Sequence, residues 1–460
     1  MKYVDCSILV VFIVDLLATT GDLGLSWTSP VYPKLYSNNS LINPLHRRIT
    51  DSEDAWLGSW LNFGAILGPV LFGYISETFG RKVGLLAIAV PHVVAFLTFA
   101  FAHNIYLYYV GRFLGGVSLG GGYCLYVIYI AEISKDSNRG KMSLTTNTFC
   151  ALGNFLPLVI GPFTSMRVFN LILACLPMTF LILFSIIAPE SPYYLVSVKK
   201  EKEAEEALMY LRSADAAGVA EELDNIKSFI KMDGRGHFTD IFNNKILRKS
   251  FLLCLVLIAS QDLSGFCAIT YHLQTIFEIS GTKLNPELAT IVVGVALLLS
   301  SVTAPSLVDK VGRKPLIVVS CFGMFVALNL LAGFFYFHDK NINTKPMFWI
   351  PILSLMIYII FFNVGICTVP WVLMSELFPN NLRQMTTAAA STFGWITSFI
   401  IANSFNDMTS MMGQSGTFWF FSSMSILCAT ITICYLPETK GKTFIQIQVM
   451  LSALPNKNIG

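Results

Sequence analysis

ETFGRK, residues 77–82, decides the fold class of this chain because it occurs twice. The second copy is DKVGRK (309–314), and both copies read acid-x-x-Gly-Arg-Lys between two apolar runs. A charged turn that recurs at corresponding places indicates an internal repeat, as in carriers built from two related halves. The pattern therefore predicts two homologous halves with a site for a solute at their interface, near the middle of the membrane.

Two more motifs follow each copy in the same order. One is a Glu with an Arg seven residues later, and the other is Pro-Glu followed by a hydroxyl residue. They lie at Glu132/Arg139 and Glu376/Arg383, and at 189–191 and 437–439. Acid–arginine pairs on one face could lock the halves together when that face is closed. The alternative is that these charges are ordinary solvated loop residues.

We predict a gating set at this inner face, in which glycines allow tight turns between spans. Its members are Glu77, Gly80, Arg81, Glu132, Arg139, Asp309, Gly312, Arg313, Glu376 and Arg383.

The composition predicts a membrane protein. Of 460 residues, 54% are hydrophobic and only 13% are charged, against about 25% charged in average soluble proteins. Each membrane span needs about 20 apolar residues. Twelve such runs lie near 6–29, 55–76, 84–103, 107–131, 143–163, 168–188, 248–278, 288–308, 315–337, 347–375, 385–408 and 416–436.

These runs predict an all-α polytopic membrane protein with twelve transmembrane helices in two six-helix bundles. The bundles are expected at 1–188 and 248–437, with a polar linker of short amphipathic helices at 189–247 and a tail at 438–460. Lys and Arg are concentrated in the linker and the termini, which predicts that these segments are cytoplasmic. We expect a multi-pass protein of the plasma membrane.

Several function classes are disfavoured by the residues. The net charge of +3 comes without a basic patch interleaved with aromatics, so no nucleic-acid partner is predicted. The ten cysteines lack CxxC spacing, and we predict neither a metal site nor a cofactor. No nucleophile–base constellation indicates an enzyme. Asn38 begins an Asn-Asn-Ser sequon in the first external loop and is a candidate glycosylation site.

Nine motifs in order resemble those of a known family. They are SWTSP (26–30), GYISETFGRK (73–82), GRFLGG (111–116), YIAEIS with RG (129–140), PESPYYL (189–195), QDLSGF (261–266), VDKVGRK (308–314), VPWVLMSELFP (369–379) and LPETKGK (436–442). The chain resembles the sugar porters of the major facilitator superfamily over nearly its whole length, and most of all the insect facilitated trehalose and glucose transporters.

The resemblance implies a central sugar site lined by helices 5, 7, 8, 10 and 11. Amides offer a donor and an acceptor without charge, and an indole offers a flat apolar face, so both suit a sugar. Matching positions give the candidate ligands Gln261, Asp262, Cys267, Asn147, Asn363, Trp371 and Trp395. Interfacial anchoring or packing is the alternative for the two tryptophans.

Several positions depart from the family pattern. Asp262 replaces a glutamine, Cys267 replaces an asparagine, Asn147 replaces a glutamine and Leu297 replaces an asparagine. Asp262 has three interpretations: a sugar ligand, a proton carrier, or a lining residue satisfied by the backbone or water.

Proton coupling is a further possibility that the resemblance implies. Arg112 matches the family's helix-4 Arg, and Asp22 lies one residue before the expected helix-1 Asp. The two could form a proton-coupling pair or a structural ion pair.

The predicted function is transport of a small neutral sugar, trehalose or a hexose, by alternating access and facilitated diffusion. The expected partners are the sugar and the lipid bilayer, and no protein partner is assigned. A proton-coupled sugar or polyol symporter is the alternative within this class. A non-transporting sugar sensor is the alternative from another class.

Overall fold

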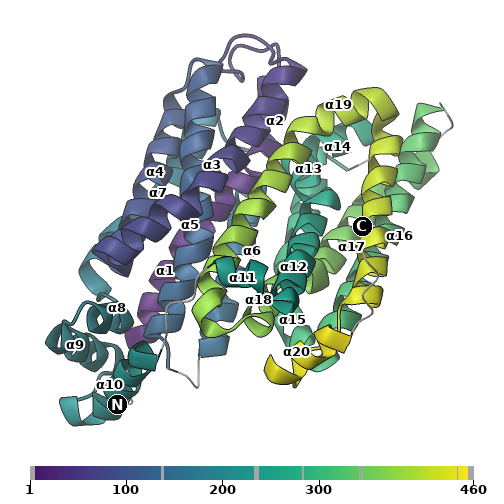
Figure 1. Cartoon of the computed structure of the whole chain (residues 1–460). Helices are drawn as coiled ribbons and strands as arrows, with labels where there is room; N and C mark the ends of the chain where they lie inside the picture. Colours follow the sequence, from purple (N-terminus) through teal and green to yellow (C-terminus); the bar gives the residue numbers. More distant parts are fainter. Residues whose placement is uncertain are drawn as a thin grey trace. The chain divides into compact units, whose positions relative to one another are not determined.

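The computed structural model describes residues 6–135, 139–232, 238–281, 284–340, 342, 345–442 and 444–453. Within these ranges the secondary structure is helical and contains no strand. The chain forms two compact units, Met1–Gly234 and Arg235–Gly460 (Figure 1).

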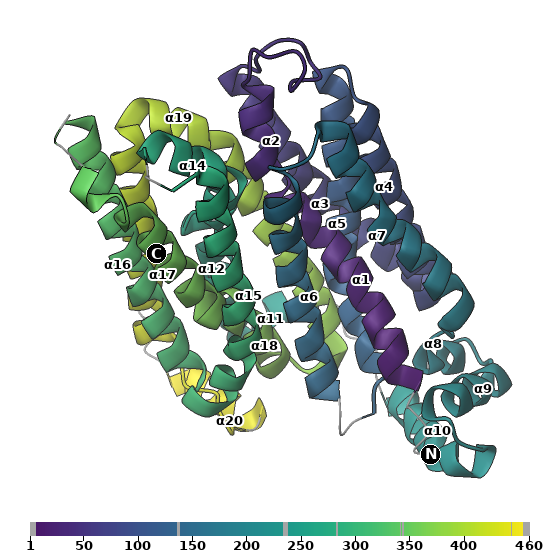
Figure 2. The same cartoon turned by 180° about the vertical axis from the view of Figure 1, so that it is seen from behind.

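The first unit contains long helices followed by three short ones. The long helices and the short α2 are α1 (Cys6–Ser26), α2 (Thr28–Leu35), α3 (Asp51–Phe79), α4 (Arg81–Phe101), α5 (Ile105–Ile133), α6 (Arg139–Ile160) and α7 (Met166–Ile187). The three that follow are α8 (Pro192–Ser197), α9 (Glu201–Arg212) and α10 (Ala216–Met232). Figure 2 shows α1 beside α6 and α7, with which it is in contact.

Local sequence signals explain both ends of α3. Thr50 accepts a hydrogen bond from the Glu53 N–H while the Glu53 carboxylate accepts one from the Thr50 N–H, a capping box that starts the helix. Gly80 ends it with φ 109° and ψ 162°, a conformation that favours glycine. The next residue begins α4, so one glycine turns the chain between two spans.

Small residues let α3 and α5 approach closely. A Cβ atom on Gly116 would lie 1.9 Å from the Leu61 carbonyl oxygen, and one on Gly120 would lie 2.1 Å from that of Ala65. Backbone-to-backbone contact of this kind is a usual way to pack helices where lipid removes the hydrophobic driving force. The glycines of the 111–122 segment therefore place α5 against α3.

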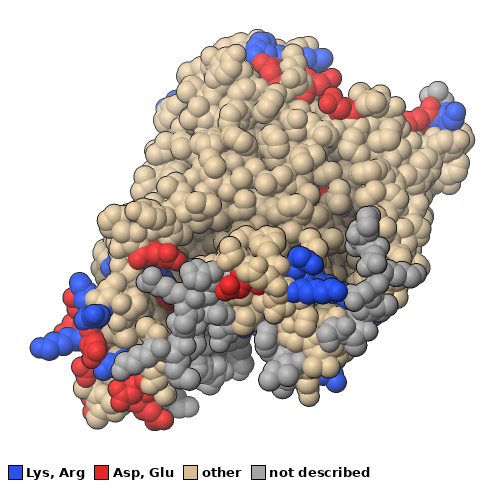
Figure 3. Space-filling view, viewed as in Figure 1, with Lys and Arg blue, Asp and Glu red and all other residues tan. Residues whose placement is uncertain are grey.

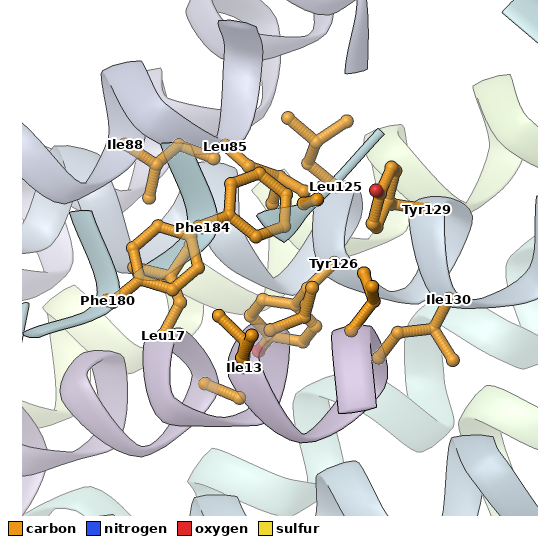
Figure 4. Close-up of a cluster of buried hydrophobic side chains, with 14 of the residues drawn as sticks. Ile13, Leu17, Leu85, Ile88, Leu125, Tyr126, Tyr129, Ile130, Phe180 and Phe184 are labelled. Atoms are coloured by element: carbon orange, nitrogen blue, oxygen red, sulfur yellow. The ribbon is translucent and has the colours of Figure 1, made fainter. Parts of the chain in front are cut away.

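The apolar core of this unit lies among α1, α4, α5 and α7 (Figure 4). Phe180 and Phe184 stack at 4.8 Å between ring centroids, and Tyr129 meets Phe184 edge to face. Ile13 and Leu17 of α1 complete the cluster. This core holds α1 in a fixed rotation, which decides where its two buried aspartates point.

The second unit repeats the long-helix pattern. Its helices are α11 (Thr239–Asn243), α12 (Lys245–Leu263), α13 (Phe266–Tyr271), α14 (Leu273–Ser280), α15 (Pro286–Val311), α16 (Arg313–Asp339), α17 (Ile350–Phe362), α18 (Val369–Leu377), α19 (Asn380–Tyr435) and α20 (Phe444–Ala453). A 3₁₀ turn, Lys345–Met347, precedes α17, and a π-helix, Asn363–Cys367, joins α17 to α18. Gly312 turns α15 into α16 with φ 107° and ψ 162°, nearly the Gly80 geometry.

Ten stretches are long and apolar enough to cross a membrane among the described residues. The last, Met385–Tyr435, is 51 residues long, which at about 1.5 Å per residue far exceeds a hydrocarbon core of about 30 Å. Gly413 is non-helical within it and divides it in two. With α6 as a further span, the helices are consistent with the twelve that the sequence predicts.

Charge is distributed as a membrane protein requires. On the visible face, Lys, Arg, Asp and Glu gather near the ends of the long helices and leave broad uncharged surfaces between (Figure 3). The predicted amphipathic helices of the linker are present as α9 and α10. They bury Ala204, Leu208 and Ile226 in a small core of their own with α8.

Candidate functional site

Two buried aspartates lie on one side of α1, seven residues apart. Asp15 accepts hydrogen bonds from the hydroxyls of Thr145 and Thr146 on α6, both at 2.7 Å. Asp22 accepts one from the Tyr123 hydroxyl and one from the Asn154 amide, also at 2.7 Å. Both carboxyl groups are thus held by neutral donors within the bundle.

The described hydrogen bonds of Arg112 go to backbone carbonyls, and its pairing with Asp22 stays a prediction. Its guanidinium donates to the carbonyl oxygens of Leu57, Gly24 and Gly58, at 2.8 Å for the first. It also lies 5.7 Å from the ring centroid of Trp27. Carbonyl oxygens of α1 and α3 therefore occupy donors of this guanidinium.

The candidate sugar ligands of the second unit begin at the end of α12. Asp262 is 8% exposed and lies 3.4 Å from the Cys267 sulfur. That sulfur lies 2.7 Å from the Ser398 hydroxyl of α19. Gln261 is half-buried, and its amide nitrogen donates to the carbonyls of Ile366 and Cys367.

Asn363 is the first residue of the π-helix and is buried. Its amide donates to the Ser300 hydroxyl at 2.8 Å and to the Leu297 carbonyl at 3.3 Å. Leu297 stands where the family pattern has an asparagine. This position still accepts a hydrogen bond, because the Leu297 carbonyl takes one from the Asn363 amide. Asn363 ties the π-helix to α15.

The other candidate ligands lie on three different helices. Asn147 is half-buried on α6, Trp371 on α18 and Trp395 on α19. Trp371 follows Pro370 at the start of α18. Each unit thus supplies buried or half-buried uncharged polar groups.

Within each unit the predicted residues form hydrogen bonds with residues that the sequence did not single out, namely Thr145, Thr146, Tyr123, Asn154, Ser300 and Ser398. Their only signal was a polar side chain inside an apolar run.

The Gly80 turn carries a network of charged groups. Arg81 approaches Glu132 at 3.4 Å, and Ser191 donates to the same carboxylate at 2.5 Å. Glu190 accepts hydrogen bonds from the backbone N–H groups of Arg81 at 2.9 Å and Lys82 at 3.1 Å, at the N-terminus of α4. A carboxylate there complements the helix dipole and the free N–H groups.

The Gly312 turn repeats this network. Arg313 pairs with Glu376 at 2.8 Å, and Thr439 donates to the same carboxylate at 2.6 Å. Glu438 accepts from the backbone N–H groups of Arg313 and Lys314, each at 3.0 Å. The sequence motifs that recur in pairs therefore form one recurring structure.

Two of the predicted acid–arginine pairs are formed within the halves, and a lock between the halves stays a prediction. The pairs Arg81–Glu132 and Arg313–Glu376 each lie within a single unit. They join the turn between two spans to the end of another span in the same bundle. Glu190 and Glu438 belong to the repeated Pro-Glu-hydroxyl motif and were not predicted to take part in gating. Their carboxylates cap the two turns.

The remaining gating candidates have different surroundings. Glu77 is exposed, and Gly80 and Gly312 are buried. Arg383 is half-buried, burial lowers its pKa, and its Nε has no hydrogen-bond partner among the described residues. The side chains of Arg139 and Asp309 lie outside the described residues.

The electrostatics of Glu190 reflect opposing effects. Burial raises the pKa of its carboxyl, while hydrogen bonds from the N–H groups of Ser191, Lys82 and Arg81 lower it in part. The net direction is upward. The turn is thus partly shielded from water.

Two further predictions concern the surface and metals. Asn38 is exposed in the segment between α2 and α3, where a glycan has room. No group of three or more His, Cys, Asp or Glu residues with metal-binding geometry exists in the part of the chain that the structure describes.

Comparisons with known proteins agree with this architecture. A model of the family described as "Sugar (and other) transporter" matches residues 28–451. The facilitated trehalose transporter Tret1 of Culex quinquefasciatus is 30% identical over 426 residues, covering 91% of this chain and 82% of that protein. Tret1 of Aedes aegypti is also 30% identical, but the chain spans only about half, 52%, of its length.

Solved structures resemble the chain in fold. The proton:xylose symporter XylE bound to 6-bromo-6-deoxy-D-glucose has a TM-score of 0.73 at 24% identity, covering 96% of this chain and 99% of that one. XylE from E. coli in a partially occluded inward-open conformation has a TM-score of 0.76 at 24% identity, covering 94% and 99%. At this identity the likeness concerns the fold alone.

Proposed function

The chain belongs to the sugar transporter family, and from this premise we propose that it carries a small uncharged sugar across a membrane by alternating access. Trehalose or a hexose is the proposed solute, because the relatives at 30% identity are named for trehalose. Facilitated diffusion is the proposed mode.

The observation that carries the proposal is the set of uncharged polar groups along the spans. Gln261, Asn363 and Asn147 are amides that lie on three of the long membrane helices or at their ends. An amide donates and accepts without charge, which matches a hydroxyl. Trp371 and Trp395 add apolar faces for the C–H side of a ring.

A carrier must also release its solute. A site of millimolar affinity corresponds to only about −4 kcal/mol, which a few amide–hydroxyl bonds and one indole contact supply. Asp262 is proposed as a further ligand whose carboxylate accepts from a sugar hydroxyl. The absence of a neighbouring cation in its described contacts, Cys267 and Ser398, favours an acceptor role.

The charged networks at Gly80 and Gly312 are proposed to stabilise each unit as it moves. Bundles that rock as rigid bodies need firm connections within each bundle. Glu132 with Arg81 and Glu376 with Arg313 are proposed to serve that purpose. A plasma-membrane location with cytoplasmic termini, and the domain limits 1–188, 189–247, 248–437 and 438–460, complete the proposal.

Proton-coupled symport is the second candidate, on one observation. Asp15 and Asp22 are both buried within a membrane helix, and the hydrogen bonds described for them come from neutral donors. Intramembrane acids are often functional. The two candidates differ in whether uptake follows an applied pH gradient.

Uptake of labelled trehalose and glucose by cells that express the protein tests both candidates. Saturable uptake at equal rates in acidic and neutral medium, with Asp262→Gln retaining uptake, is expected for facilitated diffusion. Uptake driven by external acid and abolished in Asp22→Asn would favour symport. Absence of uptake of either sugar by protein at the cell surface would overturn the proposed solute class.

A further inference from the structure

The span formed by α17 and α18 is interrupted by a π-helix at Asn363–Cys367. Such segments loosen the regular ladder of backbone hydrogen bonds and often lie at functional sites. Pro370 follows directly. Since proline has no N–H, it cannot donate to the carbonyl four residues earlier, which is that of Ile366.

Gln261 supplies the missing donor. Its amide nitrogen lies 2.8 Å from the Ile366 oxygen and 3.3 Å from the Cys367 oxygen. Both partners are carbonyls, so the amide must present its NH₂ group to them. Its two N–H bonds satisfy two carbonyls of the interrupted span.

Other helices hold the same segment by side chains. The Ser320 hydroxyl of α16 accepts from the Ile366 N–H at 3.1 Å and donates to the Phe361 carbonyl at 2.6 Å. Asn363 bonds to Ser300 of α15. The π-helix is therefore stabilised from three neighbouring helices, and α12 contributes to it through Gln261.

We infer that Gln261 is a positioning residue for this span, and that only its amide oxygen is left for the solute. The positioning role of Gln261 rests on these contacts alone. The role of its amide oxygen rests also on the proposed function. A hydroxyl that took the amide nitrogen would break both of these hydrogen bonds to carbonyls of the span. A hydroxyl that donates to the amide oxygen breaks no bond.

Two consequences follow for recognition. The solute must present a hydroxyl as a hydrogen-bond donor at Gln261, so replacing that hydroxyl by fluorine, which accepts only, loses the contact. A bond at the amide oxygen also polarises the amide and strengthens its N–H donors. Solute binding therefore tightens the hold on the π-helix instead of releasing it.

Cys367 is a natural reporter of this hold, because it lies in the π-helix and is half-buried. The first experiment measures alkylation of the purified full chain by N-ethylmaleimide without sugar, quantified for each cysteine by peptide mass spectrometry. Cys434, which is exposed, is the internal reference. Gln261→Met keeps the side-chain length without a donor, and Gln261→Glu replaces the two N–H donors by one O–H at most.

Both variants are expected to raise the Cys367 rate by about five- to thirty-fold, the factor for losing one or two kcal/mol of local stability. Ser260→Ala is the matched control, since its hydroxyl returns to Val256 of its own helix. An unchanged Cys367 rate in both Gln261 variants, with Cys434 as reference, overturns the positioning role. This arm does not depend on transport.

The second experiment adds the sugar that the wild type takes up. Wild-type Cys367 is expected to be protected and Gln261→Glu not, and each monofluoro analogue is compared with its parent. Protection retained in the variant, or equal protection by every fluoro analogue, overturns the role of the amide oxygen. If the wild type takes up neither sugar, the proposed function fails while the sugar-free arm still decides the positioning role.

Discussion

Gly80→Ala tests whether the turn between α3 and α4 has the role that its geometry indicates. Gly80 has φ 109° and ψ 162°, a region of about 1–3 kcal/mol strain for residues with a side chain. A Cβ atom there would lie 2.2 Å from the Glu190 Oε2. The Glu190 carboxylate must then move away from the N–H groups of Arg81 and Lys82.

The expected loss of stability combines these effects. Moving the carboxylate breaks charge-assisted hydrogen bonds worth about 1.5–3 kcal/mol. With the backbone strain, the free energy of unfolding falls by about 2.5–6 kcal/mol. For a unit of this size that lowers the melting temperature by about 5–24 °C. Thermal unfolding of a fluorescent fusion in detergent, at one heating rate, measures the change.

Two glycines of the same chain provide controls. Gly73 lies inside α3 with no atom within 4 Å of an added Cβ, so Gly73→Ala is expected to stabilise by about 0.4–1 kcal/mol. Gly312 has φ 107° but a larger gap of 2.9 Å to Glu438, so Gly312→Ala should fall between the other two. The reasoning is refuted if Gly80→Ala has the melting temperature of the wild type. It is also refuted if Gly80→Ala lowers the melting temperature by less than Gly312→Ala does.

The other predictions use the same assay or a simple gel. Glu376→Gln breaks a half-buried ion pair and should lower the melting temperature by several degrees, whereas Glu203→Gln, in an exposed pair, should change it by less than the error. Because burial raises the folded-state pKa of Glu190, its contribution is present at low pH and lost as pH rises through that pKa. Wild type should therefore gain stability over Glu190→Gln on acidification from neutral pH, and a pH-independent difference contradicts this. Asn38→Gln should increase gel mobility after insect-cell expression, and equal mobility would mean that the exposed sequon carries no glycan.

The repeated gating motifs predicted the two turns but not the ion pairs around them. The two copies of acid-x-x-Gly-Arg-Lys predicted two turns, and the structure gives both glycines nearly the same dihedral angles. The repeat could not tell which acid meets which arginine. Glu376 lies nearest along the chain to Arg383, yet it pairs with Arg313, 63 residues away.

The aspartates of the spans show the same limit. Asp22 was a natural partner for Arg112, since both are charged and lie within spans. The structure satisfies Asp22 with Tyr123 and Asn154, and satisfies Arg112 with backbone carbonyls. Neutral donors inside apolar runs carry no strong signal in the sequence.

The sequence by itself determined the membrane-spanning helices, the duplicated halves and the glycine turns, because hydropathy, spacing and positive φ are local properties of the chain. Only the tertiary structure decided the partners of Asp22, Arg112, Glu376 and Gln261. A hydrogen bond requires two atoms to meet within about 3 Å, and helix rotation and packing set that meeting between residues up to 132 positions apart.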